Sequence, residues 1–244
     1  MRSALASDAE YHPNPWPQGA PRKLGSEQRM SGRVSYGEAT RTLAARDPVL
    51  AGLVAEAGPM RLRRSAMSPF EALVQAIVYQ QLAGPAARAI HGRLMAALDG
   101  GVEPAAVLAL SDETLRTVGL SSAKVRSLRD LAAKALDGTV VLSPRRLARQ
   151  SDEEIIARLS TVRGIGPWSA QMFLIFQLRR LDVWPVGDLG VRHGYGLGWN
   201  VPTPSARELE PLGEPYRPYR TVLAWYCWRA AELYAGAAAS AVTS

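Results

Sequence analysis

Apolar residues recur along most of this chain at intervals of three and four positions, the spacing that places side chains on one face of an α-helix. One such segment begins at Pro69 and carries apolar side chains at Phe70, Leu73, Val74, Ile77 and Val78. The same spacing returns after Gly84, after Ser151 and from about Tyr219 to Tyr234. The pattern therefore predicts helices throughout the central region of the chain.

Residue types that favour helix starts stand at the beginning of these segments. Asp47 is followed by proline, which places a capping carboxylate before proline at the first helical position. Ser68 stands three residues before Glu71, and Ser151 three residues before Glu154. Both pairs predict a capping box, in which the serine and glutamate side chains satisfy each other's main-chain amides.

Strand patterns are almost missing. Only residues 139–142 look strand-like, and this stretch is too short to build a sheet. We therefore expect an all-α fold of about ten helices. Residues 111–120 and 151–166 resemble each other, since each predicts a helix, a tight glycine turn and the start of another helix. Such hairpins are common in helical proteins, and we interpret the first copy as plain architecture.

The two ends of the chain differ from its centre. Residues 1–35 contain prolines among Gly, Ser, Gln and Arg without apolar periodicity, which predicts a flexible arm. Residues 236–244 are mostly small and predict a frayed tail, so residues 36–235 are expected to form the folded domain. No apolar run is long enough for a secretory signal or a membrane span, and we expect a cytoplasmic protein that acts at the bacterial nucleoid.

Charge adds a candidate partner. The 244 residues include 29 Lys and Arg against 22 Asp and Glu, a net charge of +7, and almost all of the positive charge is arginine. Arginine binds phosphate through two N–H groups, so nucleic acid is a candidate partner, although a biased coding composition would give the same excess. The single cysteine, Cys227, excludes a disulfide within the chain and any four-cysteine zinc or iron–sulfur site.

The turn Gly164-Ile165-Gly166, followed by Pro-Trp-Ser, has three interpretations. A dinucleotide-binding loop is excluded, because serine replaces the third glycine and a helix precedes the turn where a strand is required. A plain linker fits, since glycine ends one helix and proline begins the next. A DNA-backbone anchor fits as well, since glycine lets main-chain amides approach a phosphate and Arg163 adds charge. Spacing alone leaves the last two open.

Four segments, in order, resemble one known superfamily. Residues 159–170, followed by Asp182-Val-Trp-Pro-Val-Gly-Asp188, resemble the helix-hairpin-helix motif and the Gly/Pro-rich loop ending in aspartate of the HhH-GPD DNA glycosylases. Residues 69–82 and 216–228 resemble the same superfamily, and the likeness is strongest to the DNA-3-methyladenine glycosylase II family, which removes alkylated bases. The resemblance covers about residues 36–235 and implies two helical lobes around a cleft.

Asp188 is the candidate catalytic residue. From its position alone it is interpreted as the N-cap of the helix that follows. The resemblance adds a second role, because the catalytic aspartate of the family falls at this position. A fixed carboxylate there would stabilise the positive charge that develops on deoxyribose as the base leaves, and would orient the attacking water. An alkylated purine already carries positive charge and leaves without a strong acid, so one carboxylate suffices.

The resemblance also implies a pocket for a base that has left the duplex. The candidate lining residues are Trp168, Met172, Trp228 and Gln80; on tryptophan statistics alone both indoles would belong to the core. Met172 and Leu189 replace aromatic residues of bacterial relatives, which predicts a roomier pocket. Relatives that also cut the strand carry lysine at the position of Trp168, so we expect a monofunctional enzyme that leaves an abasic site.

Further contacts with DNA follow from the same resemblance. The turn after the 69–80 segment supplies the side chain that fills the gap in the duplex, here Gln81 or Leu82; Gln80 and Gln81 could instead satisfy backbone groups at the helix end. The hairpin implies DNA-backbone contacts from Arg163, Gly164, Ile165 and Gly166. Hairpins of this type often bind Na⁺ or K⁺ through main-chain oxygens, here those of Ser160, Val162 and Gly164, and no cofactor is otherwise required.

The expected partner is double-stranded DNA with alkylated bases, bound by a monomer and without a membrane. The alternative is a non-catalytic helix-hairpin-helix module that binds DNA or lesions. Such a module would need the hairpin but not Asp188, Trp168 and Trp228 together. His91 and His193 lack ligand spacing to any Cys or Glu and are expected at the surface or at helix ends.

Overall fold

The computed structural model describes residues 34–99 and 101–241, and the predicted arm 1–35 lies almost wholly outside these ranges. Within them the chain folds into thirteen α-helices, one π-helix and one 3-10 helix, without a strand, which confirms the predicted all-α fold. No described helix combines the length and the apolar composition that a bilayer span requires.

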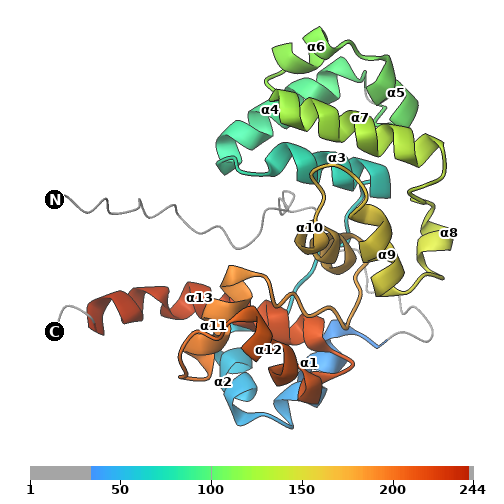
Figure 1. The fold of residues 1–244 in the computed structure, drawn as a ribbon. Coiled ribbons are helices and arrows are strands. Elements are labelled where there is room, and N and C mark those ends of the chain that lie inside the picture. The colour runs from blue at the N-terminus through green and yellow to red at the C-terminus, as the bar shows by residue number, and fades with distance from the viewer. Residues whose placement is uncertain (1–33, 100, 242–244) are drawn as a thin grey trace.

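The helices form two lobes (Figure 1). The first lobe contains α3 (Pro69–Tyr79), α4 (Gly84–Ala97), α5 (Pro104–Ala109), α6 (Asp112–Thr117), α7 (Ser122–Leu136), α8 (Pro144–Leu147), α9 (Asp152–Leu159), α10 (Pro167–Met172) and the π-helix η1 (Phe173–Gln177). The second lobe joins the two ends of the described chain and contains α1 (Tyr36–Ala44), α2 (Pro48–Ala57), α11 (Leu189–Gly198), α12 (Ala206–Leu212), the 3-10 helix η2 (Glu214–Tyr216) and α13 (Arg220–Ala241). Helices α9 and α10 lie on the side of the first lobe that faces the second (Figure 1).

The predicted helix starts are confirmed. Asp47 caps α2, and the capping boxes that begin at Ser68 and Ser151 are both formed. A third box begins at Ser205 before α12; its sequence follows the same pattern, although it is not among the predicted boxes. These side chains satisfy main-chain amides that would otherwise lack a partner at the first turn of each helix.

Two segments differ from their predicted form. Residues 139–142 form a connection rather than a strand, and the buried Val140 donates its main-chain N–H to the carbonyl of Lys134 at 2.8 Å. Helix α13 continues to Ala241, beyond Tyr234 where the sequence pattern ends. The apolar periodicity that predicted this helix stops at Tyr234, while the alanines that follow have high intrinsic helix propensity.

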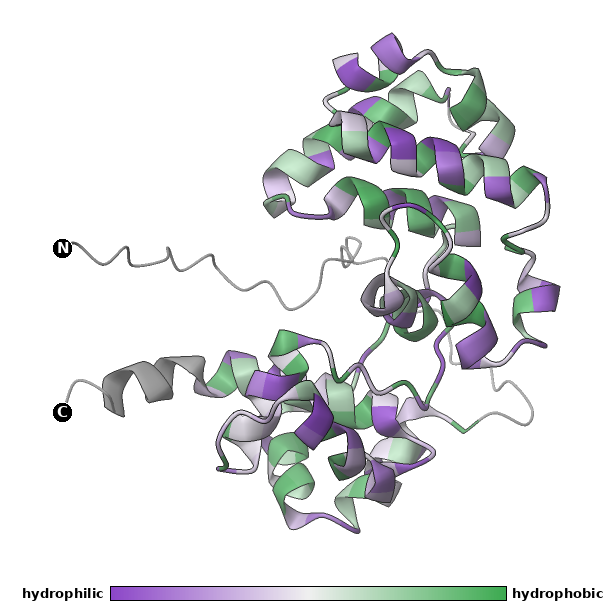
Figure 2. Ribbon diagram, viewed as in Figure 1, coloured by the Kyte–Doolittle hydropathy of each residue, from purple (hydrophilic) through white to green (hydrophobic). Residues whose placement is uncertain are grey.

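Hydrophobic and hydrophilic residues alternate along most helices of both lobes (Figure 2), and most of the buried residues are hydrophobic. One contact in the second lobe is exceptionally close. A Cβ atom on Gly194 of α11 would lie 1.7 Å from the carbonyl oxygen of Cys227 on α13. Only glycine fits at this crossing, so the two helices pack backbone against backbone. This contact fixes the position of α11, which begins directly after Asp188.

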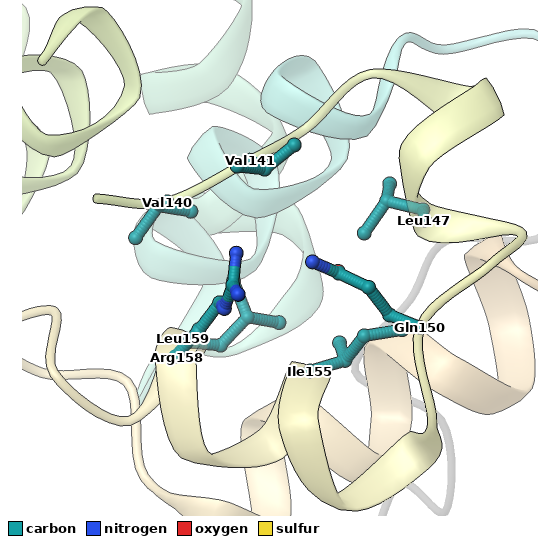
Figure 3. Close-up of a pocket in the computed structure, with 7 residues that line it drawn as sticks. All are labelled: Val140, Val141, Leu147, Gln150, Ile155, Arg158 and Leu159. Carbon is teal, nitrogen blue, oxygen red and sulfur yellow. The ribbon is translucent and has the colours of Figure 1, made fainter. Parts of the chain in front are cut away.

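Two cavities lie away from Asp188. One, of about 10 Å³, is lined by Val140, Val141, Leu147, Gln150, Ile155, Arg158 and Leu159, and has no more room than one water molecule needs (Figure 3). The other, of about 450 Å³, lies between the lobes and is lined by charged side chains that include Asp152, Arg180, Asp182 and Arg220. Most of these charges pair with one another, as Arg220 does with Asp182 at 2.8 Å.

Candidate active site

Asp188 lies at the first turn of α11, where the chain enters the second lobe. Its Oδ1 atom accepts a hydrogen bond from the main-chain N–H of Val191 at 2.8 Å, so the predicted N-cap is confirmed. The side chain is 7% exposed. A carboxylate that caps a helix in this way is held in one fixed orientation at the positive end of the helix dipole.

Two indole N–H groups also donate to this carboxylate. Trp228 of α13 donates its Nε1–H to Oδ1 at 2.9 Å, and Trp168 of α10 donates its Nε1–H to Oδ2 at 2.6 Å. The two tryptophans come from different lobes, so Asp188 lies where the lobes meet. All three donors are neutral, and they orient the carboxylate without cancelling its negative charge. The structure thus brings together three residues that are far apart in the sequence.

The two tryptophans differ in exposure. Trp228 is 4% exposed and stacks on Phe176 of η1 with ring centroids 5.7 Å apart. Trp168 is 37% exposed, so part of its ring is available to a ligand beside Asp188. Phe176 is not among the sequence-predicted residues, and its position follows from the π-helical turn, for which the sequence carries no recognised signal.

The remaining predicted pocket residues have different surroundings. Met172 is 1% exposed and belongs to the hydrophobic core, because α10 turns its side chain inward before η1 begins. Gln80, at the C-terminal end of α3, donates its side-chain amide to the carbonyl of Gly164 at 2.8 Å. It therefore connects α3 to the hairpin and does not contact Asp188. Leu189, next to the carboxylate, is 62% exposed.

The turn between α3 and α4 presents the predicted wedge residues to solvent. Gln81 is exposed and has a φ of 56°, a left-handed backbone conformation that non-glycine residues rarely adopt. Leu82 is 37% exposed although it is apolar. Strained and exposed positions of this kind cluster at functional sites. Ala83 is the N-cap of α4 and provides no side-chain hydrogen bond.

The hairpin, residues 160–166, joins α9 to α10. Gly164 has a φ of 78°, which requires glycine, and a Cβ on Gly166 would meet nothing within 4 Å. Gly166 is the N-cap of α10 and provides no side-chain hydrogen bond. Arg163 is exposed, whereas the Ile165 side chain is buried, so Ile165 would face DNA only through its main chain.

The main-chain oxygens predicted to bind a monovalent cation have other partners nearby. The carbonyl of Val162 accepts from the N–H of Ile165 at 3.0 Å, and that of Gly164 accepts from Gln80. The ammonium group of Lys134 bonds to the carbonyl of Thr161, which lies between Ser160 and Val162 in the chain. A lysine ammonium group therefore lies beside this part of the hairpin, and each carbonyl oxygen that accepts one hydrogen bond retains a second lone pair.

One titratable group near the site, the thiol of Cys227, stays neutral. Burial, and secondarily the negative charge of Asp188, raise the pKa of the Cys227 thiol well above its ordinary value. His193 is exposed, as expected. His91 is half-buried: its side chain lies against the ring of Tyr79, with ring centroids 6.0 Å apart, and its Nε2 atom is buried without a hydrogen-bond partner.

Comparisons with known proteins identify the family to which this chain is similar. Residues 74–218 match the sequence model of the HhH-GPD superfamily of base excision DNA repair proteins. DNA-3-methyladenine glycosylase 1 of Schizosaccharomyces pombe is 35% identical over 168 residues, which cover 68% of this chain and 73% of the relative.

Two solved structures resemble the chain closely. The S. pombe 3-methyladenine DNA glycosylase, in complex with abasic DNA, has a TM-score of 0.70 and 33% identity, covering 80% of this chain and 97% of that one. A DNA-3-methyladenine glycosidase from Bacillus halodurans has a TM-score of 0.74 and 34% identity, covering 81% and 91%.

Proposed function

The chain belongs to the HhH-GPD superfamily of base excision DNA repair proteins, and on this basis we propose that it is a monofunctional DNA-3-methyladenine glycosylase. It removes alkylated bases of the 3-methyladenine and 7-methylguanine type from duplex DNA and leaves an abasic site. The observation that carries this proposal is the buried carboxylate of Asp188, oriented by the N–H groups of Trp168, Trp228 and Val191.

The reaction is a hydrolysis of the bond between the base and C1′ of deoxyribose. The bonding electrons pass to the base nitrogen, which converts a cationic alkylated purine into a neutral leaving group. Positive charge then develops on the sugar, and the negative carboxylate of Asp188 stabilises it. A water molecule adds its oxygen to C1′, and its proton passes to the carboxylate or to solvent.

The two oxygens of Asp188 are not equivalent. Oδ1 accepts from Val191 and Trp228, whereas Oδ2 accepts from Trp168, the exposed member of the tryptophan pair. Oδ2 therefore retains more capacity to face the sugar and the attacking water. Because the donors are already in place, no reorientation of the carboxylate is needed when charge develops on the sugar.

Trp168 supports recognition of a charged base. Its partly exposed ring lies beside Asp188 and offers a π-face to a cationic alkylpurine, an attraction of roughly 0.5–2 kcal/mol. The same residue supports the monofunctional assignment, because an indole cannot form a Schiff base with the sugar. The two described lysines are engaged elsewhere, Lys124 with the carbonyl of Val78 and Lys134 with Asp130.

The hairpin and the α3–α4 turn supply the contacts with the rest of the duplex. Gly166 leaves the first amides of α10 without a side-chain cap, so these N–H groups are available to a phosphate. Arg163 adds a positive charge at the same turn, and Gln81 or Leu82 would fill the space of the displaced base. A Na⁺ or K⁺ ion at the hairpin stays a prediction, and no step of the reaction depends on it.

The test is chromatography of the bases that the protein releases from methylated duplex DNA. Wild type should release 3-methyladenine, and Asp188→Asn should lower the single-turnover rate about 10³-fold, since it keeps the shape of the carboxylate but not its charge. Asp188→Asn should still bind a duplex with a tetrahydrofuran abasic analogue. Full excision by this variant would contradict the role of Asp188, and binding without any base release by wild type would support a non-catalytic DNA-binding module.

A second measurement addresses the monofunctional assignment. Borohydride reduction during the reaction should trap no covalent adduct between the protein and DNA, because no lysine amine lies at Asp188. A trapped species would contradict this assignment and would leave base release itself unaffected.

A further inference from the structure

One face of α7 contacts the hairpin and the end of α3, next to the second loop that is proposed to bind DNA. The side chains on this face follow helical spacing, at Lys124, Ser127, Asp130 and Lys134. Lys124 donates its ammonium group to the carbonyl of Val78 in the last turn of α3, at 2.7 Å. The remaining three side chains face the hairpin, so the α7 polar face connects the end of α3 with residues 160–166.

Asp130 makes the central contact with the hairpin. Its Oδ2 atom accepts the main-chain N–H of Arg163 at 2.7 Å and the ammonium group of Lys134 at 2.8 Å. Lys134 in turn bonds to the carbonyl of Thr161. The carbonyl of Thr161 and the N–H of Arg163 are therefore both bonded to side chains of α7.

Ser127 and Gln80 complete this arrangement around Gly164. A Cβ on Gly164 would lie 2.6 Å from the hydroxyl oxygen of Ser127, so the hairpin lies directly on α7 at this point. The carbonyl of Gly164 accepts from the side chain of Gln80, which stands next to the exposed Gln81. The end of α3, the hairpin and α7 are thus mutually bonded.

Asp130 is an acidic residue, although it lies against a hairpin that is expected to bind phosphate groups. Burial alone would raise its pKa, but the hydrogen bonds from Lys134 and from the Arg163 amide outweigh it and lower the pKa of Asp130 below its ordinary value. The side chain is therefore an anion at neutral pH. A negative charge at this place repels DNA, so its presence indicates a positional benefit that exceeds the electrostatic cost.

We propose that Asp130 is a positioning residue for DNA binding. Its carboxylate, paired with Lys134, holds the hairpin main chain in its phosphate-binding conformation and at a fixed position relative to the turn at Gln81. The proposal rests on the proposed function, because it takes the hairpin as the DNA anchor. It assigns Asp130 and Lys134 a role through the hairpin and not through contact with the substrate.

When Asp130 is replaced, the loss of its charge and the loss of its hydrogen bonds predict opposite changes in the affinity for DNA. Loss of one negative charge near the DNA should tighten binding, since phosphate repulsion is removed. Loss of the acceptor for the Arg163 amide should weaken binding, because the hairpin main chain is then less well ordered. Asp130→Ala and Asp130→Asn make the same change in charge, but only asparagine retains an oxygen that accepts from Arg163 and Lys134.

The experiment measures the affinity of both variants for a duplex with a tetrahydrofuran abasic analogue by fluorescence anisotropy. We expect Asp130→Ala to bind about tenfold more weakly than wild type, and Asp130→Asn to bind as tightly as wild type or more tightly. Glu113→Ala is the matched charge control, because this exposed side chain lies on α6 and away from both loops. It should bind within about twofold of wild type.

Two further measurements separate this role from a general loss of structure. At saturating enzyme, Asp130→Ala should excise base within about twofold of the wild-type rate, because Asp188 is unchanged and only binding is weakened. Amide hydrogen exchange across residues 160–166 of the free protein should be faster in Asp130→Ala than in Asp130→Asn.

Equal affinity and equal exchange for the alanine and asparagine variants would overturn the proposal, and so would tighter binding by both. If wild type released no alkylated base, the proposed glycosylase activity would fail, whereas the affinity contrast between the two variants would still decide the role of Asp130.

Discussion

Two hairpins of the first lobe have the same local design and different surroundings. The first joins α6 to α7 through Gly119, which has a φ of 105°, and the second joins α9 to α10 through Gly164, with a φ of 78°. Both are preceded by a short helix with a serine N-cap and acidic residues in its first turn. The repeat seen in the sequence is therefore a repeat in structure.

The two hairpins differ in what satisfies the polar groups of the turn. At the first, Ser121 caps α7 through the amide of Lys124, and Arg93 of α4 donates to the carbonyl of Val118 at 2.8 Å. At the second, the cap position is Gly166, which has no side chain and open space beside it. The motif therefore serves packing where a serine caps the following helix, and it is suited to bind a phosphate where the cap position is a glycine.

The largest expected effect comes from giving the second hairpin a charged cap. Gly166→Asp should weaken duplex binding by about 100-fold, because a carboxylate at this N-cap would bond to the first amides of α10 and repel phosphate. Ser121→Asp adds the same charge to the first hairpin, where aspartate is an equally good cap, and should change affinity by less than about twofold. Comparable losses in the two variants would mean that the hairpins do not differ in DNA binding.

A smaller effect concerns the stability of the first hairpin. A Cβ on Gly119 would lie 2.9 Å from Nη2 of Arg93 and 3.1 Å from Cγ1 of Ile90, on a left-handed backbone. Gly119→Ala should therefore lower the free energy of unfolding by about 2 kcal/mol in urea titrations.

Gly138→Ala is the matched control for this prediction. Gly138 has a φ of 81° and open space beside it, so this variant reports the backbone strain alone, about 1 kcal/mol. Neither variant should change the affinity of the folded protein for DNA. A loss of affinity in Gly119→Ala would assign the first hairpin a part in binding.

The smallest expected effect is on the pH dependence of folding stability. It comes from a histidine of α4, the helix that contacts the first hairpin. Burial lowers the pKa of His91 below its ordinary value, against a smaller opposite effect of Glu71. The unfolded chain then binds a proton more readily than the folded one, so stability is complete above about pH 6.5 and declines as the pH falls.

His91→Phe should reduce this decline by less than about 1 kcal/mol between pH 7.5 and 5.5, measured by urea unfolding. An unchanged profile in His91→Phe would show that this histidine does not titrate differently on folding.

Sequence reasoning succeeded where the signal is local. The caps at Asp47, Ser68 and Ser151 depend on residues within one helical turn, and all three are formed. The box at Ser205 has the same local signal and could have been predicted. The all-α fold follows from such signals together with apolar periodicity.

The geometry of the site depends on contacts that spacing does not encode. Trp168 and Trp228 lie 20 and 40 positions from Asp188, and their bonds to it require both lobes to be in place. The bond between Gln80 and Gly164 joins residues 84 positions apart. Met172 faces the core from the last turn of α10, and the π-helix that begins directly after it has no signal in the residue pattern.

The backbone contact between Gly194 and Cys227 has a consequence for mutational tolerance. Any larger residue at position 194 would push α11 away from α13 by more than about 1 Å, and the acid at the start of that helix would leave its indole donors. In a library of single replacements selected for survival under a methylating agent, position 194 should thus be as invariant as Asp188, the proposed catalytic residue, although it never meets the substrate.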